Sequence, residues 1–211
     1  MKLLTISFAL AALAAAPGFA GGPTVIAEDP APAAAPTPAA VHDWSGAYVG
    51  LSYGTTSGDV QFSEGNALGS LLDLEDGSVI GVHAGYLFQR GAFVYGGELA
   101  YGAVSDMVLP GFELEDGLDY VIDLKAKGGY AVNRTLFYGV VGYSQSAFYA
   151  ESAETKMDGV SVGVGAEFAA SERLTLGLEY LSRDMSGVMT GCCIEADTTV
   201  NTLSLRVGLS F

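Results

Sequence analysis

Three features of the chain predict an all-β fold, an eight-stranded antiparallel up-and-down transmembrane β-barrel. Apolar side chains alternate with polar or small ones, short turns alternate with long acidic connections, and aromatic residues gather at the turn end of the strands. Alternation at period two gives a strand one apolar and one polar face. The clearest example is the last segment, residues 203–211, in which the apolar positions are Leu203, Leu205, Val207, Leu209 and Phe211.

The first twenty residues have the composition of a secretory signal peptide. Lys2 precedes an apolar run over residues 3–16, and small residues follow at Gly18 and Ala20. The run is too short for a membrane helix, which needs about 20 apolar residues. We therefore predict a Sec signal peptide over residues 1–20 and export from the cytoplasm.

Residues 21–43 predict a proline- and alanine-rich periplasmic tether. Five of the seven prolines of the chain lie there, and such a composition favours extended polyproline geometry without a core. Whether the tether binds peptidoglycan or only spaces the barrel from its N-terminus stays open. The barrel is expected to occupy residues 44–211.

The charge balance excludes one class of partner. With 24 acidic and 9 basic residues the net charge is −15, whereas nucleic-acid binding requires Lys and Arg to neutralise phosphates. We expect contacts with outer-membrane lipid and lipopolysaccharide, the barrel-assembly machinery and periplasmic chaperones, and a monomer. Cys192 and Cys193 are adjacent, so they are either two loop thiols or a vicinal disulfide. They lack the further ligands of a zinc site, and no metal is expected.

The alternation from residue 45 onward predicts eight strands. Their ranges are 46–55, 79–88, 93–104, 118–131, 136–149, 159–168, 173–185 and the terminal segment. In the fourth range Leu118 and Tyr120 are expected on the apolar face, and Asp119 and Asp123 on the polar face. In the fifth range, either face could be apolar after Val140. The joints at 89–92, 131–135 and 169–172 are short, whereas 56–78, 105–117, 150–158 and 183–198 are predicted as long loops. Bacterial barrels have short periplasmic turns and long extracellular loops, so both termini should be periplasmic.

An aromatic girdle is expected at the turn end of the strands, where a bilayer interface would explain it better than a soluble β-domain would. Its members are Tyr86, Phe88, Phe93, Tyr95, Tyr130, Tyr138, Phe168 and Phe211.

The polar faces of the strands collect charges that predict a lumen ion-pair network. Its predicted members are Glu98, Asp123, Lys125, Lys127, Glu167, Glu179 and Arg206, with Asp119, His83 and Arg183 nearer the rims. On the lipid face, an Arg or Lys at the midplane would cost roughly 2–4 kcal/mol. We therefore expect these side chains to point inward and to pair, since an unpaired charge there is poorly solvated. Many inward positions are glycine, which could leave water-filled voids, so a narrow pore stays open as an alternative.

Catalysis has little support in the sequence. His42 lies in the tether and His83 is a lone inward histidine, whereas a nucleophilic triad needs a base beside Ser or Cys and an acid behind it. We predict no catalytic residue and no enzyme. The acidic connections are expected to be solvated surface, with a calcium site around residues 73–76 as the sharper alternative.

Several short motifs resemble those of one family. Trp44-Ser-Gly-Ala-Tyr-Val-Gly opens the first strand, Gly85-Tyr86 and Gly129-Tyr130 close the second and fourth, Glu179-Tyr180 lies in the seventh, and Phe211 ends the chain. These residues resemble the small porin-like and immunogenic outer-membrane barrels of alphaproteobacteria, which are similar in architecture to the membrane domain of OmpA. The resemblance covers residues 44–211. Unlike full-length OmpA proteins, the sequence shows no peptidoglycan-binding domain after the barrel.

The resemblance implies an abundant structural outer-membrane barrel that supports envelope integrity and has acidic surface-exposed loops. A narrow low-conductance porin for small solutes and a ligand-binding or adhesion barrel are the alternatives. Related members bind haem, but no converging His or Tyr residues are visible in this sequence, so no cofactor is expected.

Phe211 is predicted to be an assembly signal, because an aromatic carboxy-terminal residue is read by the barrel-assembly machinery of Gram-negative cells. Deleting Phe211 should lower the amount of heat-modifiable folded protein on gels of outer-membrane fractions. Equal assembly without the residue would contradict this role.

Overall fold

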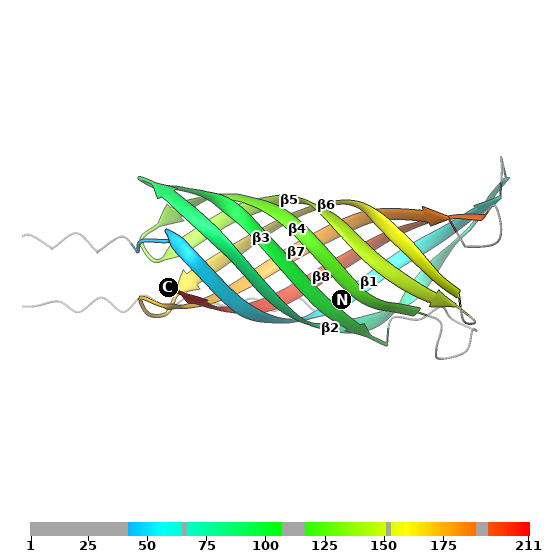
Figure 1. The fold of residues 1–211 in the computed structure, drawn as a ribbon, viewed down its shortest axis with the longest axis horizontal. Helices are drawn as coiled ribbons and strands as arrows, with labels where there is room; N and C mark the ends of the chain where they lie inside the picture. Colours follow the sequence, from blue (N-terminus) through cyan, green and yellow to red (C-terminus); the bar gives the residue numbers. More distant parts are fainter. Residues whose placement is uncertain (1–41, 65–66, 107–116, 151–152, 189–193) are drawn as a thin grey trace, which may run out of the picture. The chain divides into compact units, whose positions relative to one another are not determined.

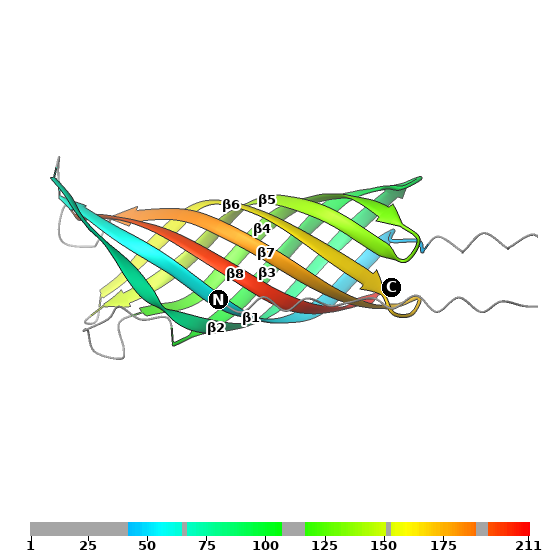
Figure 2. The ribbon, with the colours of Figure 1, turned by 180° about the vertical axis from the view of Figure 1, so that it is seen from behind.

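The computed structural model describes residues 42–64, 67–106, 117–150, 153–188 and 194–211. Over these residues eight antiparallel strands pair in chain order and close into a barrel (Figures 1 and 2), as the sequence predicts. Among them is no helix long and apolar enough to span a membrane. The predicted signal peptide, most of the tether, Cys192 and Cys193 lie outside the described residues. The strands are β1 (Gly46–Glu64), β2 (Ala67–Arg90), β3 (Phe93–Ser105), β4 (Gly117–Val132), β5 (Thr135–Ala150), β6 (Ala153–Ala169), β7 (Leu174–Val188) and β8 (Ile194–Ser210).

The pairing register determines how much space the barrel encloses. Following paired residues from Leu51 around all eight strands leads back to β1 at Gln61, ten residues further along. Such a stagger tilts the strands by roughly 35–45° from the barrel axis, and an eight-stranded barrel is only wide enough inside for side chains to fill. The lumen is therefore a side-chain core.

The two faces of the strands alternate between an apolar exterior and a polar or small interior. In β8, Leu205 is 63% exposed whereas its neighbours Ser204 and Arg206 are buried. The sequence left open which face of β5 points outward after Val140. Burial answers this, because Leu136 and Val140 are buried and Val141 is exposed. Pairing with the neighbouring strands fixes which face of β5 points into the lumen, even though both faces carry apolar side chains.

The predicted faces of Leu118 and Asp119 at the start of β4 are wrong. The register of β4 against β5 shifts between Leu118 and Tyr120, so Asp119 is an extra residue in a β-bulge. Leu118 consequently points inward and is buried, while Asp119 is exposed on the outside. A one-residue insertion reverses the face of every residue before it, which alternation alone does not reveal.

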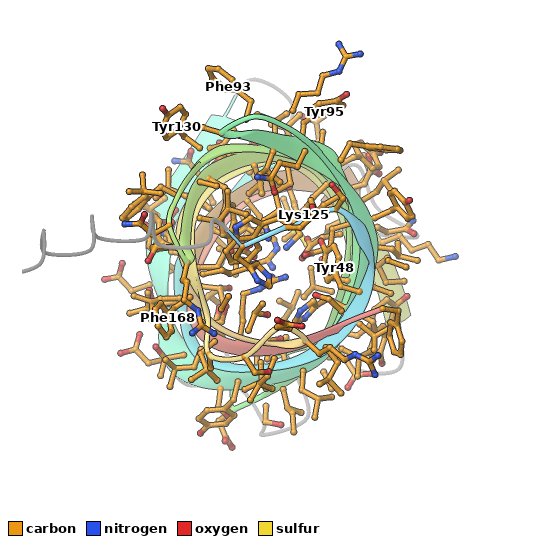
Figure 3. The ribbon with its side chains drawn as sticks, turned by 90° about the vertical axis from the view of Figure 1, so that its left-hand side faces the viewer. Tyr48, Phe93, Tyr95, Lys125, Tyr130 and Phe168 are labelled. Atoms are coloured by element: carbon orange, nitrogen blue, oxygen red, sulfur yellow. The ribbon has the colours of Figure 1, made fainter. Side chains whose placement is uncertain are left out.

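The aromatic girdle is confirmed for seven of its eight predicted members, and Tyr138 is the exception. Phe93, Tyr95, Tyr130 and Phe168 project outward in Figure 3, whereas Tyr48 and Lys125 point into the lumen. The Phe88 and Tyr95 rings stack with their centroids 5.7 Å apart. Tyr138, by contrast, is 4% exposed and lies inside, because it shares the face of the inward residues Leu136 and Val140.

A second group of outward tyrosines lies nearer the loop end. Tyr180 donates a hydrogen bond of 2.9 Å to Asn201, and Tyr143 donates one to Asp158. A tyrosine with its ring against lipid and its hydroxyl on a polar group suits a membrane interface. The two aromatic groups thus bracket the apolar band of the wall.

The short turns are confirmed, but three of the four predicted long connections are largely strand. Most of the fourth, 105–117, lies outside the described residues. Gly91 and Asn133 adopt positive φ angles of 61° and 55° in the β2–β3 and β4–β5 turns, a conformation that Gly and Asn tolerate best. At the other end, β1 continues to Glu64 and β2 begins at Ala67, so most of the predicted loop 56–78 is a hairpin. Outside the bilayer a strand needs no lipid-facing apolar residues, and its polar composition therefore resembles that of a loop.

Two inward tyrosines cover glycines on the adjacent strand. Tyr48 pairs with Gly85 and Tyr138 pairs with Gly165. A Cβ atom at Gly165 would lie 2.4 Å from Cζ of Tyr138, and one at Gly85 would lie 2.7 Å from Cζ of Tyr48. The absence of a side chain at these positions is what makes room for the two rings, as in aromatic rescue of glycine.

Replacing Gly165 by valine should therefore lower the free energy of unfolding by about 1–3 kcal/mol, the usual range for an overpacked core. Urea unfolding in lipid vesicles would measure it. Gly128→Val is the matched control, because a Cβ atom at Gly128 would have no other atom within 4 Å. Equal effects of the two substitutions would contradict the packing argument.

Candidate functional site in the barrel lumen

Four charged side chains form a closed ring across the lumen. Lys125 on β4 places Nζ 2.7 Å from Oε1 of Glu98 on β3 and 2.7 Å from Oε1 of Glu179 on β7. Arg206 on β8 pairs with the same two carboxylates, with Nη1 2.9 Å from Oε1 of Glu179 and Nη2 on Oε2 of Glu98. All four residues are at most 4% exposed. The ring therefore joins the β3–β4 wall to the β7–β8 wall.

Two tyrosines orient the carboxylates of this ring. Tyr48 donates its hydroxyl to Oε2 of Glu98 at 2.7 Å, and Tyr138 donates to Oε2 of Glu179 at 2.9 Å. Tyr48 belongs to the motif Trp44-Ser-Gly-Ala-Tyr-Val-Gly that opens the first predicted strand. Tyr138 was missed as a member of the lumen, and the glycines opposite it at 129 and 165 are the signal that could have identified it.

A second layer lies on the turn side of the ring. Lys127 places Nζ 2.6 Å from Oε1 of Glu167 and 3.8 Å from the centroid of the Tyr138 ring. Nε of Arg206 is 3.8 Å from the same Glu167 oxygen and connects this layer to the ring. The ammonium group of Lys127 thus has a carboxylate and an aromatic face as partners.

A third layer lies on the loop side and contains a cation that the sequence placed near the rim. Arg183 donates from Nε and Nη2 to the two oxygens of Asp123 at 2.9 and 2.8 Å, and from Nη1 to Thr202 at 2.7 Å. Ser144 donates to the same carboxylate at 2.6 Å. Arg183 and His83 are both buried in the lumen. The rim prediction failed for Arg183 because β7 continues to Val188, beyond its predicted end.

The buried charges of the described lumen balance. All seven residues expected in a network lie there, and Arg183 adds the fourth cation. Four carboxylates therefore face four cations, namely Glu98, Asp123, Glu167 and Glu179 against Lys125, Lys127, Arg183 and Arg206. Since each charge has an opposite partner, the desolvation of each is compensated.

Clusters of buried apolar residues lie at both ends of this charged core. The turn-end cluster includes Trp44, Leu87 and Leu136, and the loop-end cluster includes Val60, Met157 and Met185. Between the ring and the Asp123–Arg183 pair lies a cavity of about 40 Å³. A cavity of that size holds a water molecule or a few.

Five buried polar atoms have no hydrogen-bond partner among the described residues: Nε1 of Trp44, Nδ1 of His83, Oε1 of Glu98, Oγ of Ser161 and Nε of Arg206. The atoms of Glu98 and Arg206 still take part in ion pairs, with Lys125 and Glu167. Apart from Trp44, which precedes β1, these residues lie on four different strands. No group of three or more His, Cys, Asp or Glu side chains in the described ranges could hold a metal ion. Asp73 and Asp76, considered for calcium, belong to no such group. At the turn end, burial and the nearby Arg134 guanidinium lower the pKa of His42.

Comparison with known proteins agrees with this architecture. The 31 kDa outer-membrane immunogenic proteins of Brucella melitensis and Brucella suis are each 28% identical over 222 residues, covering 89% of this chain and 90% of the relative. The solved structure of the outer membrane protein OprG from Pseudomonas aeruginosa superposes with a TM-score of 0.52 at 13% identity, over 81% of this chain and 99% of that one. At this identity the likeness concerns the fold alone.

A family model described as an outer membrane protein beta-barrel domain matches residues 30–211. This match and the Brucella relatives confirm the resemblance stated from the motifs, and with it the location in the outer membrane. The chain therefore belongs to the outer membrane β-barrel domain family.

Proposed function

We propose that this protein is a structural outer-membrane barrel whose sealed lumen supports envelope integrity. The observation that carries the proposal is the charge-balanced network, which spans the lumen between two apolar clusters. A side-chain core of this kind cross-braces opposite walls of the barrel. Its role requires neither a catalytic group nor a cofactor.

The network selects one arrangement of the lumen side chains, and its net contribution to the free energy of folding is small. Buried ion pairs recover little beyond their desolvation cost, but removal of one partner leaves an uncompensated charge. Lys125 and Arg206 each contact both Glu98 and Glu179. The four side chains are therefore mutually dependent.

The inward glycines argue against a continuous pore. The space beside them is occupied, because a Cβ atom at Gly50 would lie 2.3 Å from Nε2 of His83, and one at Gly177 would lie 2.7 Å from Cγ of Glu167. At Gly85 and Gly165 the tyrosine rings take that space. These four glycines accommodate large neighbours and leave no open channel beside them, which supports a structural role better than a porin.

The partners in this proposal are those of an integral surface protein. Lipid and lipopolysaccharide contact the apolar wall, the assembly machinery and chaperones deliver the chain, and the folded barrel is a monomer. The Brucella relatives are named immunogenic, which supports exposure of the loop end at the cell surface.

A strain lacking the gene should become more sensitive to detergent and shed membrane blebs while its uptake of small solutes stays unchanged. Loss of a bracing protein weakens the membrane, whereas loss of a pore slows uptake. Detergent-sensitivity assays and uptake of a labelled sugar would measure the two effects. Re-expression of the wild-type chain is the control.

The contrary result is an intact envelope with reduced uptake. Current recordings from the purified full-length protein in planar bilayers give a direct second test. We expect no single-channel current. Reproducible single-channel steps would establish the porin alternative instead.

Replacing Arg206 by methionine should lower the free energy of unfolding by about 3–5 kcal/mol, because Glu98 and Glu179 would each lose a buried partner. Denaturant unfolding in lipid vesicles can be followed by the fluorescence of Trp44, the only tryptophan of the chain. Arg173→Met is the matched control, since Arg173 lies exposed between β6 and β7. Unchanged unfolding of the Arg206 variant would show that the network is dispensable.

A further inference from the structure

The β1–β2 hairpin has a strand edge without a partner among the described residues. β2 pairs with β1 from Ala67 to Leu87, but its pairing with β3 begins only at Ser78. Figures 1 and 2 show that the hairpin extends further along the barrel than the ends of β3 and β4 at the same side. Along β2 from Ala67 to Gly77, the N–H and C=O groups that point away from β1 have no partner strand in the described ranges, and such an edge can pair with another strand.

The side chains beside this edge offer contacts on both faces of the hairpin. Leu71 lies opposite Gln61 on the outer face and is 59% exposed, and Leu72 lies opposite Val60 on the inner face and is 40% exposed. A strand that pairs with β2 would set alternate side chains against one leucine and then the other, which is how strand addition achieves specificity.

The charge of the hairpin restricts the partner. Residues 56–77 contain five acidic residues and no Lys, Arg or His. Asp59 and Asp73 lie directly opposite each other across the β1–β2 pair, and like charges in that position are destabilising. A cation on an adjoining strand beside Asp73 would relieve this repulsion.

We propose that the free edge of β2 binds an extended, cationic segment of another protein by strand addition, with Lys or Arg on the outer face and apolar side chains on the inner face. A second copy of this chain is disfavoured as the occupant, because two acidic edges would repel each other. This binding function goes beyond the structural role of the lumen and does not depend on it.

A ten-residue peptide in which lysine alternates with valine is a suitable probe. We expect saturable binding to the folded full-length protein in uncharged detergent micelles, measured by fluorescence anisotropy. Two further peptides carry a methyl group on the backbone amide nitrogen, one at every lysine and the other at every valine. Their charge equals that of the unmethylated peptide. Because a strand presents only alternate N–H groups to its neighbour, one of the two should lose at least about tenfold in affinity and the other should retain it.

Asp73→Asn should weaken binding of the unmethylated peptide, whereas Asp184→Asn on β7, away from the edge, should not. If both methylated peptides bind with equal affinity, binding is due to charge attraction without strand pairing, and the proposal is overturned. Absence of saturable binding would overturn it as well. So would a dimer in sedimentation experiments that Asp73→Lys alters, since a second copy would then occupy the edge.

Discussion

The buried ring of Glu98, Lys125, Glu179 and Arg206 is the interaction on which the rest of the barrel depends. Charges placed in a lumen too narrow for bulk water are costly unless each has a partner. The other features of the interior follow from that constraint. Tyrosine hydroxyls donate hydrogen bonds to the carboxylates, apolar clusters pack at both ends of the charged core, and glycines give the large side chains room to meet.

The ring has an approximate two-fold repeat, in which equivalent residues lie four strands apart. Tyr48 on β1 corresponds to Tyr138 on β5, and Glu98 on β3 corresponds to Glu179 on β7. Lys125 on β4 likewise corresponds to Arg206 on β8. Since four strands are half of an eight-stranded barrel, equivalent groups face each other across the lumen. Each cation can therefore bridge both carboxylates.

The membrane band and the loop end differ in what restricts their sequences. Within the band, an outward residue must be apolar and an inward residue must fit a crowded core. Beyond it the β1–β2 hairpin has no lipid to face, and its residues 56–77 include five acidic residues beside leucines, with Val60 still packed in the loop-end cluster. The charged core and the residues of β2 before Ser78, which pair only with β1 in the described ranges, thus belong to separate parts of one barrel, and a change in one need not affect the other.

The sequence by itself determined the barrel, its strand count, its short turns and the seven charges of the lumen, because period-two alternation and the cost of a charge in lipid are properties of single strands. It did not determine which charges pair, since partners such as Glu98 and Arg206 are joined only when β3 and β8 face each other across the closed barrel. The bulge at Asp119, the inward ring of Tyr138 and the pairing of Arg183 depend on the register between strands. Tertiary structure decided them because register is a relation between neighbours that no isolated strand contains.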